Sequence, residues 1–275
     1  MVMRCRSLGF LTDLSILERG GSRIERRKGY WKISSLHNPT FYWGNFLLID
    51  GSPSTLTLAE WQDYFVREFP TAAHFALGID DPEGGVAPLF IPEESHLEVL
   101  ASVVLTTSTI DLVDRRTSDI ENRPLVSDAD WQSSLEIDLV TRDASYLEAP
   151  YREYLADKVL TRRALCESGA GAWWGTFVDG QLVSQAGIID CGESVARYQT
   201  VGTHPEFRRR GFSSLTISAA GHYAANTFGS ETLVIVADPD YHAIDLYQQL
   251  GFRNSETQLQ IQRRPSNSRA QVTTN

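Results

Sequence analysis

Three consecutive arginines, Arg208–Arg210, run directly into Gly211, between a predicted strand that ends at Thr203 and an apolar helical pattern that begins near Phe212. The first N–H groups of a helix have no partner inside the helix, and the helix dipole makes that end positive. Glycine lets a ligand approach the backbone closely, and guanidinium groups suit phosphate oxygens. The loop therefore predicts a site for a phosphate-bearing ligand. A solvated arginine-rich turn is the alternative interpretation of the same residues.

A second pattern follows in residues 240–252, DYHAIDLYQQLGF. Four of its residues fall at i, i+3, i+4 and i+7 of a helix and share one face: Ala243, Leu246, Tyr247 and Leu250. This face is expected to pack on a sheet, and a buried tyrosine hydroxyl needs a hydrogen-bond partner there. Tyr247 can therefore be an ordinary core residue or a residue with a chemical role.

Together the two patterns resemble the GNAT superfamily of acyl-CoA N-acyltransferases. Residues 201–214, VGTHPEFRRRGFSS, are similar to its motif A, Q/R-x-x-G-x-G/A, with Ser213 where the family prefers Gly or Ala. Residues 240–252 are similar to its later motif N-x-x-A-x-x-L-Y-x-x-x-G-F, with Asp240 in place of Asn. The resemblance covers about residues 123–262. It implies a mixed, mostly antiparallel sheet flanked by helices, an α/β (α+β) fold.

The resemblance also implies a reaction and its residues. An acyl group, most simply acetyl, would pass from acetyl-CoA to a primary amine of a small molecule or protein by direct attack in a ternary complex, without a metal. The pyrophosphate of coenzyme A would bind the loop residues Arg208, Arg209, Arg210, Gly211, Phe212 and Ser213. The pantetheine arm would pair with the backbone at Val201 and Thr203. An amide of that strand would polarise the thioester carbonyl.

Proton transfer needs an acid and a base. The resemblance implies that Tyr247 donates a proton to the leaving thiolate, since a phenol with a pKa near 10 keeps its proton at pH 7. The sequence leaves the base open among four residues: Asp190, Glu193, Tyr198 and His222. Glu193 is favoured because bases in this family are often Glu near that strand, although it also fits a solvated turn residue.

Two other classes of function stay open at this point. One is a coenzyme-A-binding sensor or interaction module without catalysis, which Ser213 and the undetermined base favour. The intact loop and Tyr247 favour the active enzyme instead. The other is a plain nucleotide-binding α/β domain, which does not account for the motif at residues 240–252.

The elements that must position these residues can be read from hydrophobic periodicity and turn signals. Asn38-Pro39 separates two strands in residues 30–50, and Asp179-Gly180 is a hairpin signal between strands 172–178 and 181–189. The other predicted strands are 73–79, 97–107, 196–203, 233–237 and 257–262. Predicted helices cover 57–69, from Ser127 or Asp128 to about 140, 151–167, from Phe212 to about 227, and 241–250. The second half therefore reads β-α-α-β-β-β-α-β-α-β.

Length and composition set the limits of this interpretation. The chain has 275 residues, enough for two domains, and its formal net charge of -10 argues against non-specific nucleic-acid binding. We expect an N-terminal α/β domain over 1–122, which could be a degenerate GNAT-like unit, a linker within 114–123, a GNAT acetyltransferase domain over 123–265, and a disordered tail over 266–275. Three irregularly spaced cysteines indicate reduced thiols, and no segment is long and apolar enough to cross a membrane. A cytoplasmic protein is expected.

Overall fold

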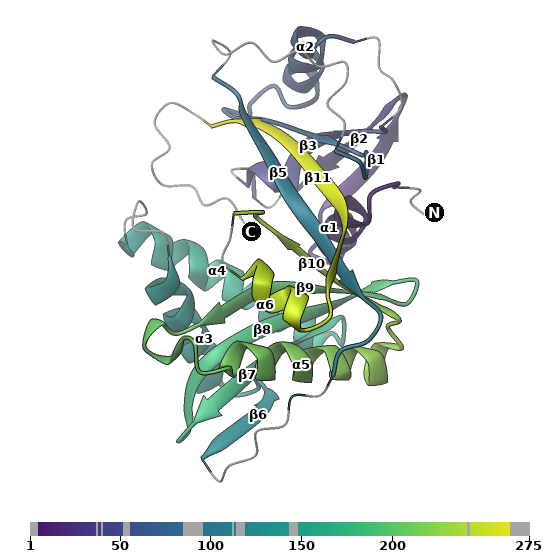
Figure 1. Cartoon of the computed structure of the whole chain (residues 1–275). Helices are drawn as coiled ribbons and strands as arrows, with labels where there is room; N and C mark the ends of the chain where they lie inside the picture. Colours follow the sequence, from purple (N-terminus) through teal and green to yellow (C-terminus); the bar gives the residue numbers. More distant parts are fainter. Residues whose placement is uncertain are drawn as a thin grey trace. The chain divides into compact units, whose positions relative to one another are not determined.

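The computed structural model describes residues 5–36, 38–39, 41–51, 56–84, 96–111, 113, 119–142, 148–240 and 243–264. The chain divides into two compact units (Figure 1). The first unit comprises Met1–Leu105, Val236–Tyr241 and Asn254–Asn275, and the second comprises Thr106–Ile235 and His242–Arg253. The predicted functional domains, 1–122 and 123–265, stay a prediction, and the predicted tail at 266–275 lies outside the described residues.

Five neighbouring strands lie wholly or mostly in the second unit, in the order β10-β9-β8-β7-β6. Their bounds are β6 Ile120–Pro124, β7 Gly171–Val178, β8 Gln181–Gly192, β9 Val195–Thr203 and β10 Thr232–Ala237. Neighbouring strands are antiparallel except for β9 and β10, which are parallel. Because residues alternate between the faces of a strand, adjacent tryptophans of β7 face opposite sides of the sheet.

Helices cover the two faces of this sheet. Trp173 contacts Trp131 of α3 (Asp128–Thr141), and α4 (Glu148–Glu167) lies on the same side. Trp174 contacts Tyr223 at the end of α5 (Phe212–Tyr223) on the other side. The predicted cap of α3 is confirmed, since the Ser127 hydroxyl accepts from the Asp130 amide and the Asp130 carboxylate accepts from the Ser127 amide.

The first unit contains the strands β1-β2-β3-β4-β11-β5 in that order. Their bounds are β1 Arg23–Arg27, β2 Tyr30–Ser34, β3 Asn45–Ile49, β4 Phe75–Ile79, β11 Arg253–Arg263 and β5 Glu98–Thr107. Two helices belong to this unit, α1 (Leu8–Arg19) and α2 (Leu58–Glu68), and they pack on one apolar core with the strands. The helix predicted over 57–69 is observed as α2, whose Leu58, Trp61 and Phe65 are buried.

The two units share one connectivity. In each, three antiparallel strands are followed by a helix and then by a strand parallel to the third: β1-β2-β3-α2-β4 in the first unit and β7-β8-β9-α5-β10 in the second. The first unit therefore repeats the core topology of the second. A tandem GNAT-like chain requires such a repeat.

Several sequence-based predictions need correction. The interpretation of residues 114–123 as a linker is wrong for 120–123, which belong to β6, an edge strand whose polar side chains reach solvent. Of the helix predicted over 241–250, residues 241–242 lie outside the described residues, and α6 covers Ile244–Gln249, so Ala243 and Leu250 are not part of it. Two further elements, α1 and β1, were not predicted from the sequence. Among the described residues, no helix has the length and the apolar character that crossing a membrane requires.

Candidate functional site

Strands β9 and β10 pair over only part of their lengths. Val195–Arg197 pair with Thr232–Val234 of β10, and the described register between the two strands ends there although β9 continues to Thr203. Within the described residues of the second unit, the later part of β9 thus has backbone groups on this side that no β10 residue engages. An extended chain can add to such an edge through main-chain hydrogen bonds.

A β-bulge lies in this same part of β9. Gln185 of β8 is opposite Gly202 and Gly187 is opposite Gln199, so two residues of β9 lie opposite one residue of β8. One of the two, Thr200, has a φ of 49°, which a threonine rarely adopts. Bulges re-aim the backbone and side chains around them, and here the change falls next to Val201.

The arginine-rich loop follows directly. After one short turn at Pro205–Phe207, Gly211 takes a left-handed conformation with a φ of 80° and forms the N-cap of α5. No side chain among the described residues caps this helix, so its first amides are available to a ligand. The structure thus brings Val201, Thr203 and the predicted loop residues together at one end of β9.

The three arginines of the loop are exposed. Arg208 donates from Nε to the carbonyl oxygen of Thr203 at 3.3 Å, and the guanidinium of Arg210 lies 5.3 Å from the ring centroid of Phe207. Phe212 is buried and Ser213 half-buried in the first turn of α5. Three cations and a positive helix end therefore face solvent at one place, as binding of a polyanion requires.

The corresponding helix of the first unit has a different N-terminus. The Thr57 hydroxyl caps α2 by accepting from the Glu60 amide. The Thr57 amide in turn donates to a carboxylate oxygen of Glu60 at 2.7 Å. Hydrogen bonds from the backbone amide and the hydroxyl of Thr57 lower the pKa of Glu60. At this helix end the Thr57 amide is thus engaged by a carboxylate and the Glu60 amide by a hydroxyl, whereas no side chain caps α5.

Tyr247 is buried on α6, with 4% of its surface exposed. Its ring lies edge-on to Phe252 at 6.4 Å between centroids, and Phe252 in turn lies 5.9 Å from Tyr198. Tyr198 donates its hydroxyl proton to the Ile217 carbonyl oxygen at 2.7 Å, and burial raises its pKa above the usual range. Tyr198 is therefore held neutral and does not suit the role of base.

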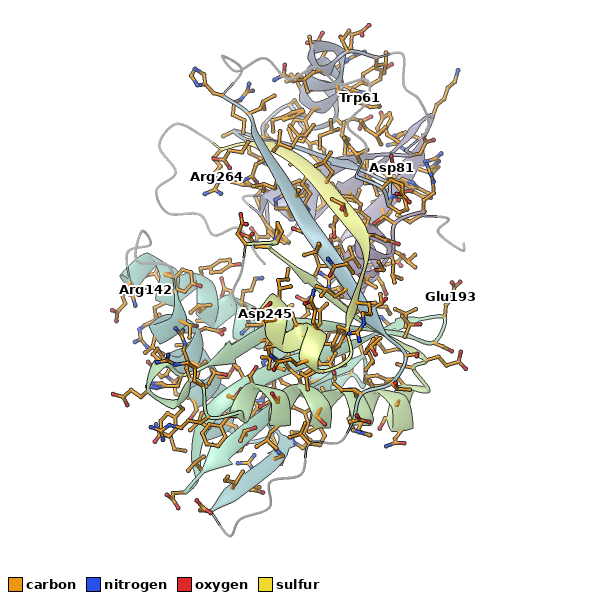
Figure 2. The ribbon with its side chains drawn as sticks, in the orientation of Figure 1. Trp61, Asp81, Arg142, Glu193, Asp245 and Arg264 are labelled. Carbon is orange, nitrogen blue, oxygen red and sulfur yellow. The ribbon has the colours of Figure 1, made fainter. Side chains whose placement is uncertain are left out.

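Glu193 is not brought close to the loop. It lies in the turn between β8 and β9 with a φ of 49° and is exposed, at the opposite end of β9 from Thr203 (Figure 2). Nearby, the Asp190 carboxylate accepts from the Gly192 amide at 2.9 Å. His222 lies near the C-terminal end of α5, and its Nε2 is buried without a hydrogen-bond partner among the described residues.

A buried polar network lies beside the bulge, and it was not predicted from the sequence. Arg162 of α4 pairs through Nη1 with Asp138 of α3 and donates from Nη2 to the Thr200 hydroxyl at 3.1 Å. Gln185, fully buried in β8, donates to Asp138 Oδ1 at 2.8 Å. The guanidinium also stacks over the Trp173 ring at 4.8 Å. The one available signal was a glutamine in the middle of the apolar strand 181–189.

No group of three or more His, Cys, Asp or Glu side chains in the described part of the chain is arranged to hold a metal ion. None of the three cysteines, all of them among the described residues, forms a disulfide bond. Burial raises the pKa of Cys166 to about 11, and burial together with the charge of Asp80 raises that of Cys5 above the usual range. These two thiols are therefore protonated at neutral pH and are poor nucleophiles.

Solved structures with the same fold cover both units. A GCN5-related N-acetyltransferase from Kribbella flavida has a TM-score of 0.64 at 14% identity, covering 96% of each chain. A conserved protein from Staphylococcus epidermidis ATCC 12228, described as functionally unknown, has a TM-score of 0.64 at 16% identity, covering 87% of this chain and 92% of its own. A tandem GNAT protein from the clavulanic acid biosynthesis pathway has a TM-score of 0.54 at 14% identity, covering 81% and 74%. At these identities the likeness shows the fold, which is that of GNAT proteins.

The sequence identifies the family of the second unit. Residues 131–252 match the model of the acetyltransferase (GNAT) family. This segment contains β9, the arginine loop, α5 and Tyr247, and it is a GNAT acetyltransferase domain. No protein of curated function matches the sequence.

Proposed function

We propose that the protein is an acyl-CoA-dependent N-acyltransferase that transfers acetyl from acetyl-CoA to a primary amine by direct attack in a ternary complex. The observation that carries the proposal is the continuous path from the edge of β9 that β10 leaves open to the uncapped N-terminus of α5. The extended pantetheine arm suits the first, and the pyrophosphate suits the second.

Each part of coenzyme A has a matching group in this path. Val201 and Thr203 offer backbone groups to the amides of the pantetheine arm. The amides at Gly211, Phe212 and Ser213 take the pyrophosphate oxygens, and Arg208, Arg209 and Arg210 supply charge. Ser213 has a larger side chain than the Gly or Ala of the family pattern, but it keeps the backbone amide that binding uses.

The bulge at Thr200 supplies the hydrogen-bond donor that polarises the thioester carbonyl. A backbone amide re-aimed by the bulge can donate to the thioester oxygen while negative charge develops on it. The amine attacks the carbonyl carbon, the C–S bond breaks, and the thiolate receives a proton. We assign that proton to Tyr247.

Fewer observations support the choice of a general base than support Tyr247 as the general acid. Glu193 stays our candidate, but β9 separates it from Val201 by eight residues, or roughly 25 Å at the rise of a strand. A proton leaving an amine at the bulge would therefore reach Glu193 only through water. An amine that enters the site already deprotonated needs no such base.

The test is acetyl transfer from acetyl-CoA to a panel of primary amines, followed by detection of the free thiol and by mass spectrometry of the product. We expect at least one amine to be acetylated and calorimetry to detect coenzyme A binding. Binding of coenzyme A without transfer to any amine would instead support a sensor without catalysis. Absence of binding would overturn the proposal.

A further inference from the structure

A buried arginine contacts the bulge of β9. Thr200, within the bulge, is β-branched and has a φ of 49°, and a residue in such a conformation persists only where its surroundings hold it there. Arg162 of α4 is buried, and its Nη2 donates to the Thr200 hydroxyl at 3.1 Å. This hydrogen bond restrains the side chain of the strained residue, so Arg162 can hold the backbone of the bulge in place.

The guanidinium of Arg162 is itself fixed by neighbouring side chains. Its Nη1 pairs with Asp138 of α3, and its plane lies 4.8 Å from the centroid of the Trp173 ring. Asp138 also accepts from Gln185 Nε2 at 2.8 Å. A guanidinium is a rigid planar fork, so its separate donors can contact separate partners at once. One side chain thus joins α3 and α4 to the bulge.

The supporting side chains come from the strand positions on both sides of the bulge. Gln185 and Gly187 of β8 lie opposite Gly202 and Gln199 of β9. The Gln185 amide oxygen accepts from Trp173 Nε1 at 3.3 Å. The Trp173 ring lies directly against Gly187, because an added Cβ there would come within 2.3 Å of a ring atom. The network therefore contacts β8 on either side of the point where β9 bulges.

The contribution of such a network to stability does not by itself account for it. A buried ion pair can often be replaced by apolar side chains of similar volume without loss of stability. A hydrogen-bond donor contributes most to catalysis when it is aimed in advance at the place where charge develops. The contact between Arg162 and Thr200 supplies such advance fixation at the bulge.

We propose that Arg162 is a positioning residue, which holds Thr200 so that a backbone amide of the bulge is already aimed at the thioester oxygen when acetyl-CoA binds. This inference rests on the proposed function. Arg162 acts on the reaction only through the Thr200 hydroxyl. Loss of the contact should therefore lower kcat and leave the affinity for coenzyme A unchanged, because the pyrophosphate binds at α5 and coenzyme A lacks the acetyl carbonyl.

The first experiment removes the hydroxyl of Thr200 and then restores it. Thr200→Val keeps the branched shape without the hydroxyl, and Thr200→Ser keeps the hydroxyl. With an accepted amine, we expect kcat to fall at least about tenfold in Thr200→Val, since outright loss of such a donor costs about 10²–10³-fold. Thr200→Ser should keep most of the wild-type kcat. Calorimetry should give both variants a Kd for coenzyme A near that of the wild type.

Thr161→Val is the matched control. Thr161 is an exposed residue of α4 next to Arg162, and its hydroxyl donates to the Asp157 carbonyl oxygen at 3.1 Å. This variant should have the wild-type kcat. A wild-type kcat in Thr200→Val would overturn the positioning role, and so would a Thr200→Ser variant that is as slow as Thr200→Val.

A double-mutant cycle tests the role of Arg162 directly. Arg162→Lys keeps a cation for Asp138, but a single Nζ lacks the two separate Nη groups that contact Asp138 and Thr200. Because Arg162 acts through Thr200, the variant with both Arg162→Lys and Thr200→Val should be no slower than the slower single variant. Losses in kcat that multiply in the double variant would overturn the inference.

A second readout does not depend on turnover. Calorimetry compares a ketone analogue of acetyl-CoA, in which a methylene group replaces the sulfur, with the analogue that also has a methylene group in place of the carbonyl. The wild type should bind the ketone at least about threefold more tightly, as one hydrogen bond does. Thr200→Val should lose this preference, and Thr200→Ser and Thr161→Val should keep it.

This comparison separates the inference from the proposed function. If no amine is acetylated, the proposed function fails, and the preference for the ketone alone decides whether Arg162 and Thr200 position a donor. Equal affinities of the wild type for the two analogues would overturn the inference while coenzyme A binding stands. A preference that Thr200→Val retains would overturn it as well.

Discussion

Tyr247 has the burial of a core residue and a hydroxyl that the proposed reaction needs. Replacing it by Phe keeps the ring packed against Phe252 and removes only the proton donor. General acid catalysis contributes about 10²–10⁴-fold, so we expect kcat to fall at least about tenfold. Coenzyme A affinity, measured by calorimetry, and the melting temperature should stay near the wild-type values. An unchanged kcat on an accepted amine would show that Tyr247 serves packing alone.

Gly211 offers a sharp test of the pyrophosphate site. Gly211→Asp places a carboxylate at the α5 N-terminus, and we expect coenzyme A to bind at least about tenfold more weakly because like charges repel and charge-assisted hydrogen bonds are lost. Gly180→Asp is the matched control. Its φ of 78° is close to the 80° of Gly211, and an added Cβ meets no atom within 4 Å. Equal affinities of the two variants for coenzyme A would show that the loop is not part of the binding site.

At the scale of elements, the start of α3 depends on one carboxylate. Asp130 accepts two hydrogen bonds from the Arg123 guanidinium and one each from the Val126 and Ser127 amides. Its hydrogen bond to Arg123, ahead of those to the two amides, holds its pKa well below the usual range. This stabilisation is fully present above the unfolded pKa, near 4, and is lost as the pH falls toward the folded pKa.

We therefore expect Asp130→Asn to lower the free energy of unfolding by about 1–3 kcal/mol at pH 7. The difference from wild type should shrink when both proteins are unfolded with urea below pH 4, where the wild-type carboxylate loses its advantage. A difference that stays constant between pH 7 and pH 3.5 would contradict this role for the ionised carboxylate.

The network between α3, α4 and β9 allows a test with neighbouring arginines. Arg162→Met leaves Asp138 buried without its cation, and loss of one partner of a buried pair costs about 3–5 kcal/mol. Arg163→Met breaks pairs with Asp128 and Glu167 on the exposed side of α4, and we expect a loss below about 1 kcal/mol. Urea unfolding of both variants makes the comparison. Equal losses would mean that Arg162 does not stabilise the bulge.

Local signals explain which elements the sequence predicts. Asp179-Gly180 places two residues at positive φ between strands, and both angles are observed, at 49° and 78°. β6 has no such signal, because its residues IENRP are mostly polar and lie at an edge. The N-cap of α1 is Ser7, whose hydroxyl accepts from the Phe10 amide, and this local signal was not used to predict the helix.

The residues of the candidate site also differ in whether local sequence signals predict them. The loop and Tyr247 lie within two contiguous motifs, so their residue types and spacing were enough to select them. The bulge was not predictable, because Thr200 is β-branched and gives no hint of a positive φ. The contacts of Arg162 with Asp138 and Thr200 join residues 24 and 38 positions apart. Such contacts depend on tertiary packing that no local pattern records.

For the molecule as a whole, the two units share one topology but differ at the N-terminus of the helix that connects the parallel strands. Both units place a helix between two parallel strands, but α2 begins with its own capping box and α5 begins with an uncapped glycine. A carboxylate at the α2 N-terminus competes with any anionic ligand there. Under the proposed function, the pyrophosphate therefore binds at α5 of the second unit and not at α2 of the first.

Strand β11 lies between β4 and β5 in the sheet of the first unit. Ile261 is fully buried and lies opposite Leu77 of β4. Ile261→Ala should cost about 2–5 kcal/mol, whereas Val66→Ala, at a valine that is 61% exposed on α2, should change stability by less than about 0.5 kcal/mol. Hydrogen exchange would locate the loss, because the amides of β4 should exchange faster in the first variant alone. Unchanged exchange in β4 would contradict this dependence.

The position of β11 also affects how the protein is synthesised. β4 ends at Ile79, and its partner β11 begins at Arg253. At about 5–20 residues per second, a ribosome needs on the order of 10 s or more to reach that partner. During this interval one edge of β4, whose five residues are all buried in the finished fold, has no β11 to pair with. An unpaired apolar edge is a template for aggregation, so this edge of β4 is open to pairing with other chains until β11 emerges.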